Sequence, residues 1–150
     1  MKTLYEQKGY SKEWIEKRLR GIAIRQELTN EWKARGVEQE LEFAILTNDI
    51  TKATFDLSVE EYRKRKQLGK ENLRDHMDDL ELIFTMLGEK VTTEIARNKD
   101  ARGLPQNRVA AKEGGGIAGN ARKETEKKLG RKVANEGNYL DAPEKRKKLE

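Results

Sequence analysis

Residues 113–122 read EGGGIAGNAR, a glycine pattern whose spacing matches a phosphate-binding motif. Gly114, Gly116 and Gly119 fit G-x-G-x-x-G, the dinucleotide fingerprint, in which glycines let the backbone approach a pyrophosphate. That fingerprint must follow a β-strand and open a helix. Residues 107–113, NRVAAKE, are instead typical of a helix interior, so the dinucleotide interpretation lacks its structural context.

The same glycines also have the outer spacing of a P-loop, because Gly114 and Gly119 are five residues apart. A P-loop needs Lys and then Ser or Thr after its last glycine, to reach the phosphates and the magnesium ion. Here Asn120 and Ala121 occupy those positions. We therefore expect no nucleotide, and no other cofactor, at the glycine run.

A packing role explains these small residues better. If a helix that begins at Pro105 continues through them, Gly114 and Ala118 lie in one i+4 row, and Gly115 and Gly119 lie in the next. Two such rows let another helix approach closely, and the helix immediately before is the best partner. The alternative is that the glycines break the helix into two pieces.

Other catalytic chemistry has little support in the sequence. The chain has no cysteine and one histidine, which excludes thiolate nucleophiles and cysteine-ligated metals. His76 with Asp75 and Asp79 could hold a metal ion, but a solvated first helical turn with Arg74 paired to Asp78 explains the same residues. No Ser/His/Asp set stands out, so we predict a non-enzymatic protein without a catalytic or metal site.

Basic residues suggest a different kind of chemistry, the binding of phosphates. The sharpest cluster is the run at 63–66, and the next is KRKK at 145–148. A solvated helix face or a tail is the competing interpretation. The candidate nucleic-acid contacts are Arg63, Lys64, Arg65, Lys66, Lys70, Arg108, Lys112, Arg122 and Lys123.

The elements that carry these residues are predicted to be helices. Charged residues make up 39% of the chain, so the apolar residues must be concentrated on narrow stripes, which favours helices over sheets. Two prolines in 150 residues and many strong helix formers point the same way. No segment approaches the roughly 20 apolar residues of a membrane span, so we expect a cytoplasmic protein without membrane contact.

Helical periodicity and capping signals place the elements of the first half. Ser11 can cap a helix that runs to Arg35, on which Trp14 and Trp32 are the largest apolar side chains and are interpreted as packing or interface residues. The stretch 41–47 fits either a short strand or a buried helical turn, because periodicity does not separate the two in brief apolar runs; helix is favoured, with Thr47 capping a short helix through residue 55. A capping box at 58–61 opens another helix that stops near residue 69.

The strongest signal is one long helix at 71–101, because apolar residues recur there at helical spacing: Leu73, Met77, Leu80, Phe84, Leu87, Val91 and Ile95. A second helix at 105–129 follows after Gly103-Leu104-Pro105. Acidic residues dominate 71–100 and basic residues dominate 101–150, which indicates complementary helices before it indicates a nucleic-acid surface. We predict an all-α, multi-helix domain at 1–140 built on this long antiparallel hairpin. Residues 141–150 are predicted to be a flexible basic tail, whose final Leu-Glu is typical of a cloning remnant.

Five stretches together resemble the C-terminal part of the family of DNA-damage-inducible protein D and BRO-type phage antirepressors. They are WIEKRLRGIAIRQELTNEW at 14–32, AILTNDITKATF at 44–55, ENLRDHMDDLELIFTMLGE at 71–89, TTEIAR at 92–97 and EGGGIAGNAR at 113–122. The resemblance spans about residues 10–140. It implies a bacterial cytoplasmic protein of the SOS response or of prophage regulation, without a catalytic motif.

The resemblance also implies partners. An N-terminal BRO domain, the DNA-contacting half in such proteins, is missing here, so the chain is expected to be a C-terminal domain. We expect it to bind a protein partner, a recombinase filament or a repressor, or to self-associate as a homo-oligomer. Direct DNA binding through the basic clusters is the alternative.

Overall fold

The computed structural model describes residues 2–138, and every regular element in that range is helical. No helix there combines the length and the apolar composition needed to cross a membrane. The predicted all-α class is confirmed, while the predicted tail at 141–150 lies outside the described residues. The helices are α1 (Lys2–Gln7), α2 (Lys12–Ala34), α3 (Glu40–Phe55), α4 (Val59–Arg65), the 3-10 turn η1 (Leu73–His76), α5 (Asp79–Asn98) and α6 (Gly103–Leu129).

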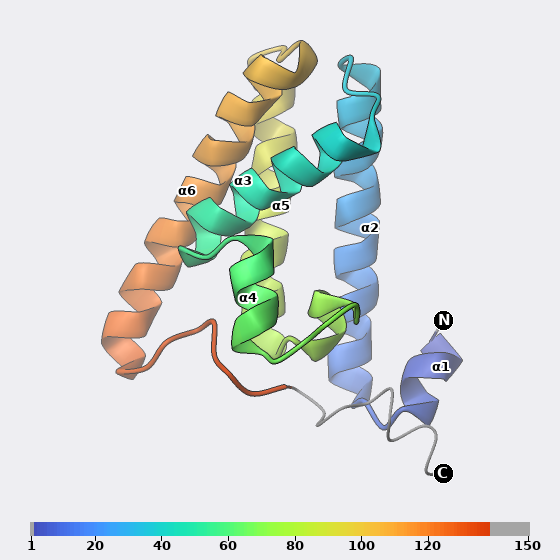
Figure 1. The fold of residues 1–150 in the computed structure, drawn as a ribbon, viewed down its shortest axis with the longest axis vertical. Helices are drawn as coiled ribbons and strands as arrows, with labels where there is room; N and C mark the ends of the chain where they lie inside the picture. The colour runs from blue at the N-terminus through green and yellow to red at the C-terminus, as the bar shows by residue number, and fades with distance from the viewer. Residues whose placement is uncertain (1, 139–150) are drawn as a thin grey trace.

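The predicted antiparallel hairpin is present and consists of α5 and α6. Figure 1 shows the two helices side by side, with α2 along the other side of α5 and α3 crossing in front of the pair. A short turn at 99–102 joins them, and Gly103, at a φ of 72°, begins α6 two residues before Pro105. Because α5 contacts α2, α3 and α6, it is the central helix of the domain.

The single helix predicted for 71–101 is wrong at its beginning. Residues 73–76 form η1, and Met77 and Asp78 are extended before α5 starts. Asp78 is the N-cap of α5, since its carboxylate accepts from the backbone N–H of Glu81 while the Glu81 carboxylate accepts from the N–H of Asp78. This capping box satisfies two free backbone donors and fixes a new helix start.

The glycine run does not break α6, which is continuous from Gly103 to Leu129. A Cβ on Gly114 would lie 2.1 Å from Oγ1 of Thr92 on α5, and one on Gly119 would lie 2.2 Å from the carbonyl oxygen of Ala53 on α3. Both distances are far below van der Waals contact, so these positions exclude any larger residue. The small face of α6 is therefore occupied within the domain, by α5 and also by α3.

The first half of the chain shows one more correction. Thr47 does not cap a helix but lies inside α3, where its hydroxyl donates to the Phe43 carbonyl oxygen at 2.7 Å. The capping box of Ser58 and Glu61 is confirmed, although α4 ends at Arg65, earlier than predicted.

The two tryptophans belong to separate parts of the core, and both are fully buried. Trp14 lies against Tyr5 and Tyr10, and its indole N–H donates to the Met77 carbonyl oxygen at 2.8 Å. Trp32 stacks on Phe43 of α3. These contacts attach α1, η1 and α3 to the long helix α2, which thereby becomes one wall of the candidate site.

Candidate functional site

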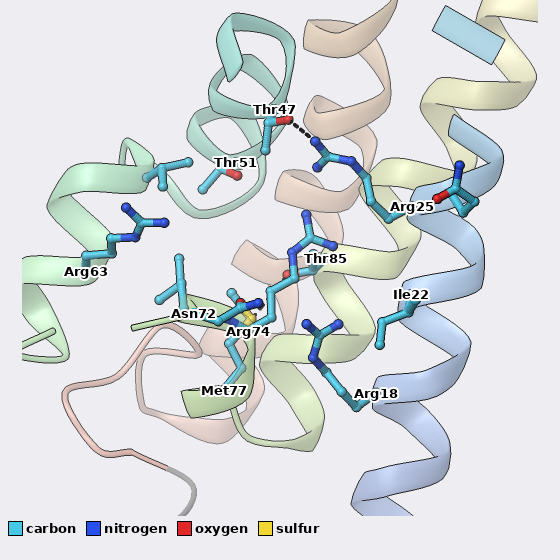
Figure 2. A pocket seen from close by; sticks show the side chains of 13 residues that line it. Arg18, Ile22, Arg25, Thr47, Thr51, Arg63, Asn72, Arg74, Met77 and Thr85 are labelled. Carbon is cyan, nitrogen blue, oxygen red and sulfur yellow. Dashed lines mark hydrogen bonds between the residues drawn. The ribbon is translucent and has the colours of Figure 1, made fainter. Parts of the chain in front are cut away.

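The most distinctive hollow of the described structure is a pocket of about 380 Å³ between α2, α3, α4, η1 and α5. Four arginines line it: Arg18 and Arg25 from α2, Arg63 from α4 and Arg74 from η1. No acidic side chain is among its lining residues, which otherwise are neutral polar or apolar. Figure 2 shows the four arginines around one space, two on α2 and one each on α4 and η1.

Glu89 on α5 anchors two of these arginines from behind. Arg74 donates to both carboxylate oxygens, at 2.8 and 2.7 Å, and Arg25 donates to one of them at 3.1 Å. Arg25 also donates to the hydroxyl of Thr47 at 2.7 Å, which ties α2 to α3 (Figure 2). Burial works against the charge of Glu89, but the two guanidinium groups lower its pKa below the ordinary value.

The other two arginines, Arg18 and Arg63, differ in whether they already have a hydrogen-bond partner within the protein. Arg18 donates through Nε to Asp75 at 3.0 Å, and Tyr5 donates to the same carboxylate oxygen at 2.9 Å. The buried Nε of Arg63 has no hydrogen-bond partner among residues 2–138. A buried charged donor without a partner is costly, so Arg63 is the arginine of the pocket most in need of an external acceptor.

A second buried charge cluster lies at the other end of the α4 helix, around Glu81. Lys66 donates to Glu81 at 3.0 Å and to the Gly137 carbonyl oxygen at 2.6 Å, and Tyr62 donates to the other oxygen of Glu81. Burial raises the pKa of Glu81 to about 7 despite the nearby Lys66 ammonium. This cluster closes the core and attaches the segment after α6, and it opens into no pocket described above.

The basic run predicted as a phosphate contact does not form one surface. Tyr62 and Lys66, four residues apart, share the buried face of α4, whereas Lys64 is exposed and pairs with Glu60. Arg65 donates to the Ala134 carbonyl oxygen. Of the four basic residues, Arg63 is the one that lines the arginine pocket.

The predicted contacts elsewhere are similarly divided. Arg122 is buried and donates to the Thr54 carbonyl oxygen at 2.6 Å and to Glu126, and Arg108 pairs with Asp49 on α3. Lys70, Lys112 and Lys123 are exposed on separate parts of the surface. A phosphate could reach Lys66 or Arg122 only if each left its present partners.

The residues considered for a metal ion are held in other pairs. Asp75 binds Arg18 and Tyr5, and Asp79 pairs with Lys17 at 3.5 Å. Arg74, expected to pair with Asp78 in a helical first turn, instead turns to Glu89. Across residues 2–138, no three His, Cys, Asp or Glu side chains are grouped closely enough to hold a metal ion.

Sequence reasoning missed three of the four arginines and both buried glutamates. A signal for part of the site was present, because Arg18 and Arg25 are seven residues apart and share one face of α2 with Ile22. The approach of Arg74 depends on η1, and no short-range pattern shows that contact. No protein-family model, no curated protein and no solved structure matches this chain.

Proposed function

We propose that this chain is a non-enzymatic binding domain of a regulatory protein, and that the arginine pocket holds an anionic group of its ligand or partner. The observation that carries the proposal is the meeting of four guanidinium groups in a pocket without an acidic lining residue. A guanidinium stays protonated in proteins, so it orients anions through its fixed donors but cannot serve as a general base. The pocket is better suited to recognition than to acid–base catalysis.

The family resemblance supports a regulatory setting for this binding. Residues 71–97 and 113–122 resemble DNA-damage-inducible protein D and the BRO-type antirepressors, so a cytoplasmic role in the SOS response or in prophage control is part of the proposal. A recombinase filament or a repressor would be the protein partner. Self-association is the second protein contact to consider, because Val109 and Ile117 expose apolar side chains two turns apart on α6.

A filament-binding titration tests this function. The chain would be added to a bacterial recombinase filament assembled on fluorescently labelled single-stranded DNA, and to the same DNA without recombinase. We expect tighter binding to the filament, and at least about tenfold weaker binding for Arg63→Glu, because reversing a charge inside the pocket repels an anionic group. Lys33→Glu is the control, since Lys33 is exposed near the end of α2 and lies outside the arginine pocket.

Two results would count against the proposal. One is a filament affinity no higher than that for bare DNA, and the other is an equal loss in the two variants. Sedimentation of the free chain would show in parallel whether it self-associates.

Direct DNA binding is the second candidate function, and one observation favours it. The C-terminal end of α6 and the residues just after it expose five basic side chains: Lys123, Lys127, Lys128, Arg131 and Lys132. Such a cluster can neutralise phosphates, with an affinity that falls steeply as salt rises. Binding to bare DNA with that salt dependence, lost when Lys127 and Arg131 are replaced by Gln, would favour this function over the first.

A further inference from the structure

We infer that the arginine pocket binds a phosphate dianion, either inorganic phosphate or the phosphate monoester of a small metabolite. This inference rests on the proposed function, in which the pocket holds an anion, and it specifies the chemical class of that anion. Three properties of the site carry it: its charge balance, the directions of its donors and its shape.

The charge balance of the pocket calls for two negative charges. Four arginines contribute four positive charges, and the carboxylates bonded to them are Glu89, shared by Arg25 and Arg74, and Asp75 on Arg18. Two positive charges therefore stay uncompensated. A phosphate monoester carries close to two negative charges above its second pKa of about 6. A single carboxylate would leave one positive charge in the pocket.

The donors approach from several directions, which suits a tetrahedral ligand. Arg18 comes from α2, Arg63 from α4 and Arg74 from η1, so charged side chains line the pocket from three elements (Figure 2). The fork of Arg74 is taken up by Glu89, so the paired donors for a ligand come from Arg63 and Arg18. A terminal phosphate group presents three oxygens in a tetrahedral arrangement and accepts paired N–H donors from arginine. A planar carboxylate has two oxygens and can satisfy fewer of these directions at once.

Arg63 gives the ligand a specific role. Its buried Nε has no hydrogen-bond partner among the described residues, whereas Arg25 and Arg74 are held in place by Glu89. Because this Nε is closed off from solvent, a phosphate oxygen would bond the terminal nitrogens of the Arg63 guanidinium, which make no hydrogen bond to residues 2–138. Arg25 and Arg74, which Glu89 holds, thus form a fixed wall of the pocket. Arg63 completes the site as the arginine whose donors are available to a ligand.

The surroundings leave room for an ester group. The hydroxyl of Thr51 and the amide of Asn72 line the pocket and add neutral polar groups beside the guanidinium groups. A second hollow of about 790 Å³ adjoins the pocket and shares Arg25, Thr47, Val59 and Arg63 with it. A small organic group attached to the phosphate could extend in that direction.

Titration calorimetry on the whole chain, in chloride buffer at pH 8, tests the ligand class. The probes are inorganic phosphate, sulfate, adenosine monophosphate and acetate. We expect one phosphate per chain, similar binding of the dianion sulfate, and acetate weaker by at least about tenfold because it carries one charge fewer. Tighter binding of adenosine monophosphate than of phosphate would identify a small ester as the ligand, and equal binding would identify free phosphate.

Variants connect that binding to the pocket. Arg63→Gln should weaken phosphate binding at least about tenfold. Lys33→Gln removes the same charge from an exposed position on α2 that lies outside both hollows, so it should weaken binding less than about twofold. Arg63→Lys keeps the charge but loses the paired donors, so it should fall between wild type and Gln. Circular dichroism would confirm that each variant is folded.

Three results would overturn the inference. Acetate that binds as tightly as phosphate would make the pocket a carboxylate site, which leaves the proposed function intact. If single-stranded DNA without a terminal phosphate displaced bound phosphate and adenosine monophosphate did not, the pocket would be a site for the phosphodiesters of a nucleic-acid backbone. No binding of any probe, or an equal loss in the Gln variants of Arg63 and Lys33, would reject the pocket as an anion site and the proposed function with it.

Discussion

Two glutamates on α5, Glu81 and Glu89, are both almost completely buried, yet their pKa values shift in opposite directions. Burial raises the pKa of Glu81 from an ordinary 4.5 to about 7. At Glu89 the same desolvation is outweighed, and the pKa is lowered. The charge state of a buried carboxylate is therefore set by its partners and not by the depth of burial.

The partners differ in charge and in geometry. Glu89 receives a two-pronged contact from Arg74 and a further bond from Arg25, so three charge-assisted hydrogen bonds replace its lost hydration. Glu81 receives one ammonium, from Lys66, and two neutral donors, the phenol of Tyr62 and the backbone N–H of Asp78. A single ammonium offsets less of the desolvation cost than two guanidinium groups. The cluster around Glu89 thus builds a fixed, charged wall for the pocket, while that around Glu81 titrates near neutral pH.

The largest expected effect is that of Glu89→Gln. Gln cannot neutralise Arg25 and Arg74, which would face each other as buried positive charges, and the removal of one partner from such a network costs about 3–5 kcal/mol. Urea unfolding at pH 7 would measure this loss in the free energy of unfolding. Glu94→Gln, exposed on the same helix, is the control and should leave stability nearly unchanged. If Glu89→Gln lowered the free energy of unfolding no more than Glu94→Gln does, the ionised Glu89 would not stabilise the fold and would not differ from Glu81 in this respect.

The second prediction concerns pH and distinguishes the two glutamates. The folded protein holds the Glu81 proton more tightly than the unfolded chain does, so the stability of the wild type falls relative to Glu81→Gln as pH rises from 4.5 to about 7. At about 1.4 kcal/mol per pH unit, this difference is on the order of 3 kcal/mol and is constant above pH 7.

Glu89 should behave in the opposite way. Its lowered pKa means that the ionised form stabilises the fold, so the advantage of the wild type over Glu89→Gln is present above the unfolded pKa of about 4.3 and is lost as pH falls below it. Unfolding titrations of the wild type and both variants from about pH 2 to pH 8 check the two slopes. Slopes of the same sign would contradict the assignment.

These two glutamates also show where sequence reasoning succeeded and where it failed. The hairpin was predictable, because the small face of α6 and the break at 103–105 depend on local sequence. On α5, however, the predicted apolar stripe included Leu87 and Val91, which are half-buried, whereas Glu89 and Thr92 beside them are buried. A central helix packed closely against a glycine face must bury small and polar residues there. Hydropathy therefore missed part of the buried face, although Phe84 of the same stripe is buried.

The start of α5 gives a similar lesson about capping. Asp78 and Glu81 have the spacing of a capping box, a local signal that could have placed the helix start, but the apolar period through Leu73 and Met77 concealed it. The arginine pocket was less accessible to prediction. Only Arg63 was singled out, because the pocket joins side chains from helices distant in sequence.

A smaller effect is expected from Arg74→Lys, which separates the contribution of the guanidinium geometry from that of the positive charge. Lysine keeps the positive charge but presents no fork, so the two parallel bonds to Glu89 are reduced to one, and about 1–2 kcal/mol of stability should be lost. The pKa of Glu89 should rise toward its ordinary value. Urea unfolding and the acid limb of the stability profile would measure both changes, and an unchanged profile would show that charge alone is sufficient.

The smallest effect is expected from Tyr62→Phe, which tests the weaker network. Phe can keep the edge contact with Phe55 but cannot donate to Glu81, so about 1 kcal/mol should be lost. The Tyr62 hydrogen bond lowers the pKa of Glu81, so its loss should move the pH window of Glu81 upward from about 7. A window that moves downward would mean that the phenol opposes the ionised form. Lys66 would then be the sole charged group that stabilises the ionised Glu81, beside the backbone N–H of Asp78, and Glu81 would differ even more from Glu89, which two guanidinium groups hold.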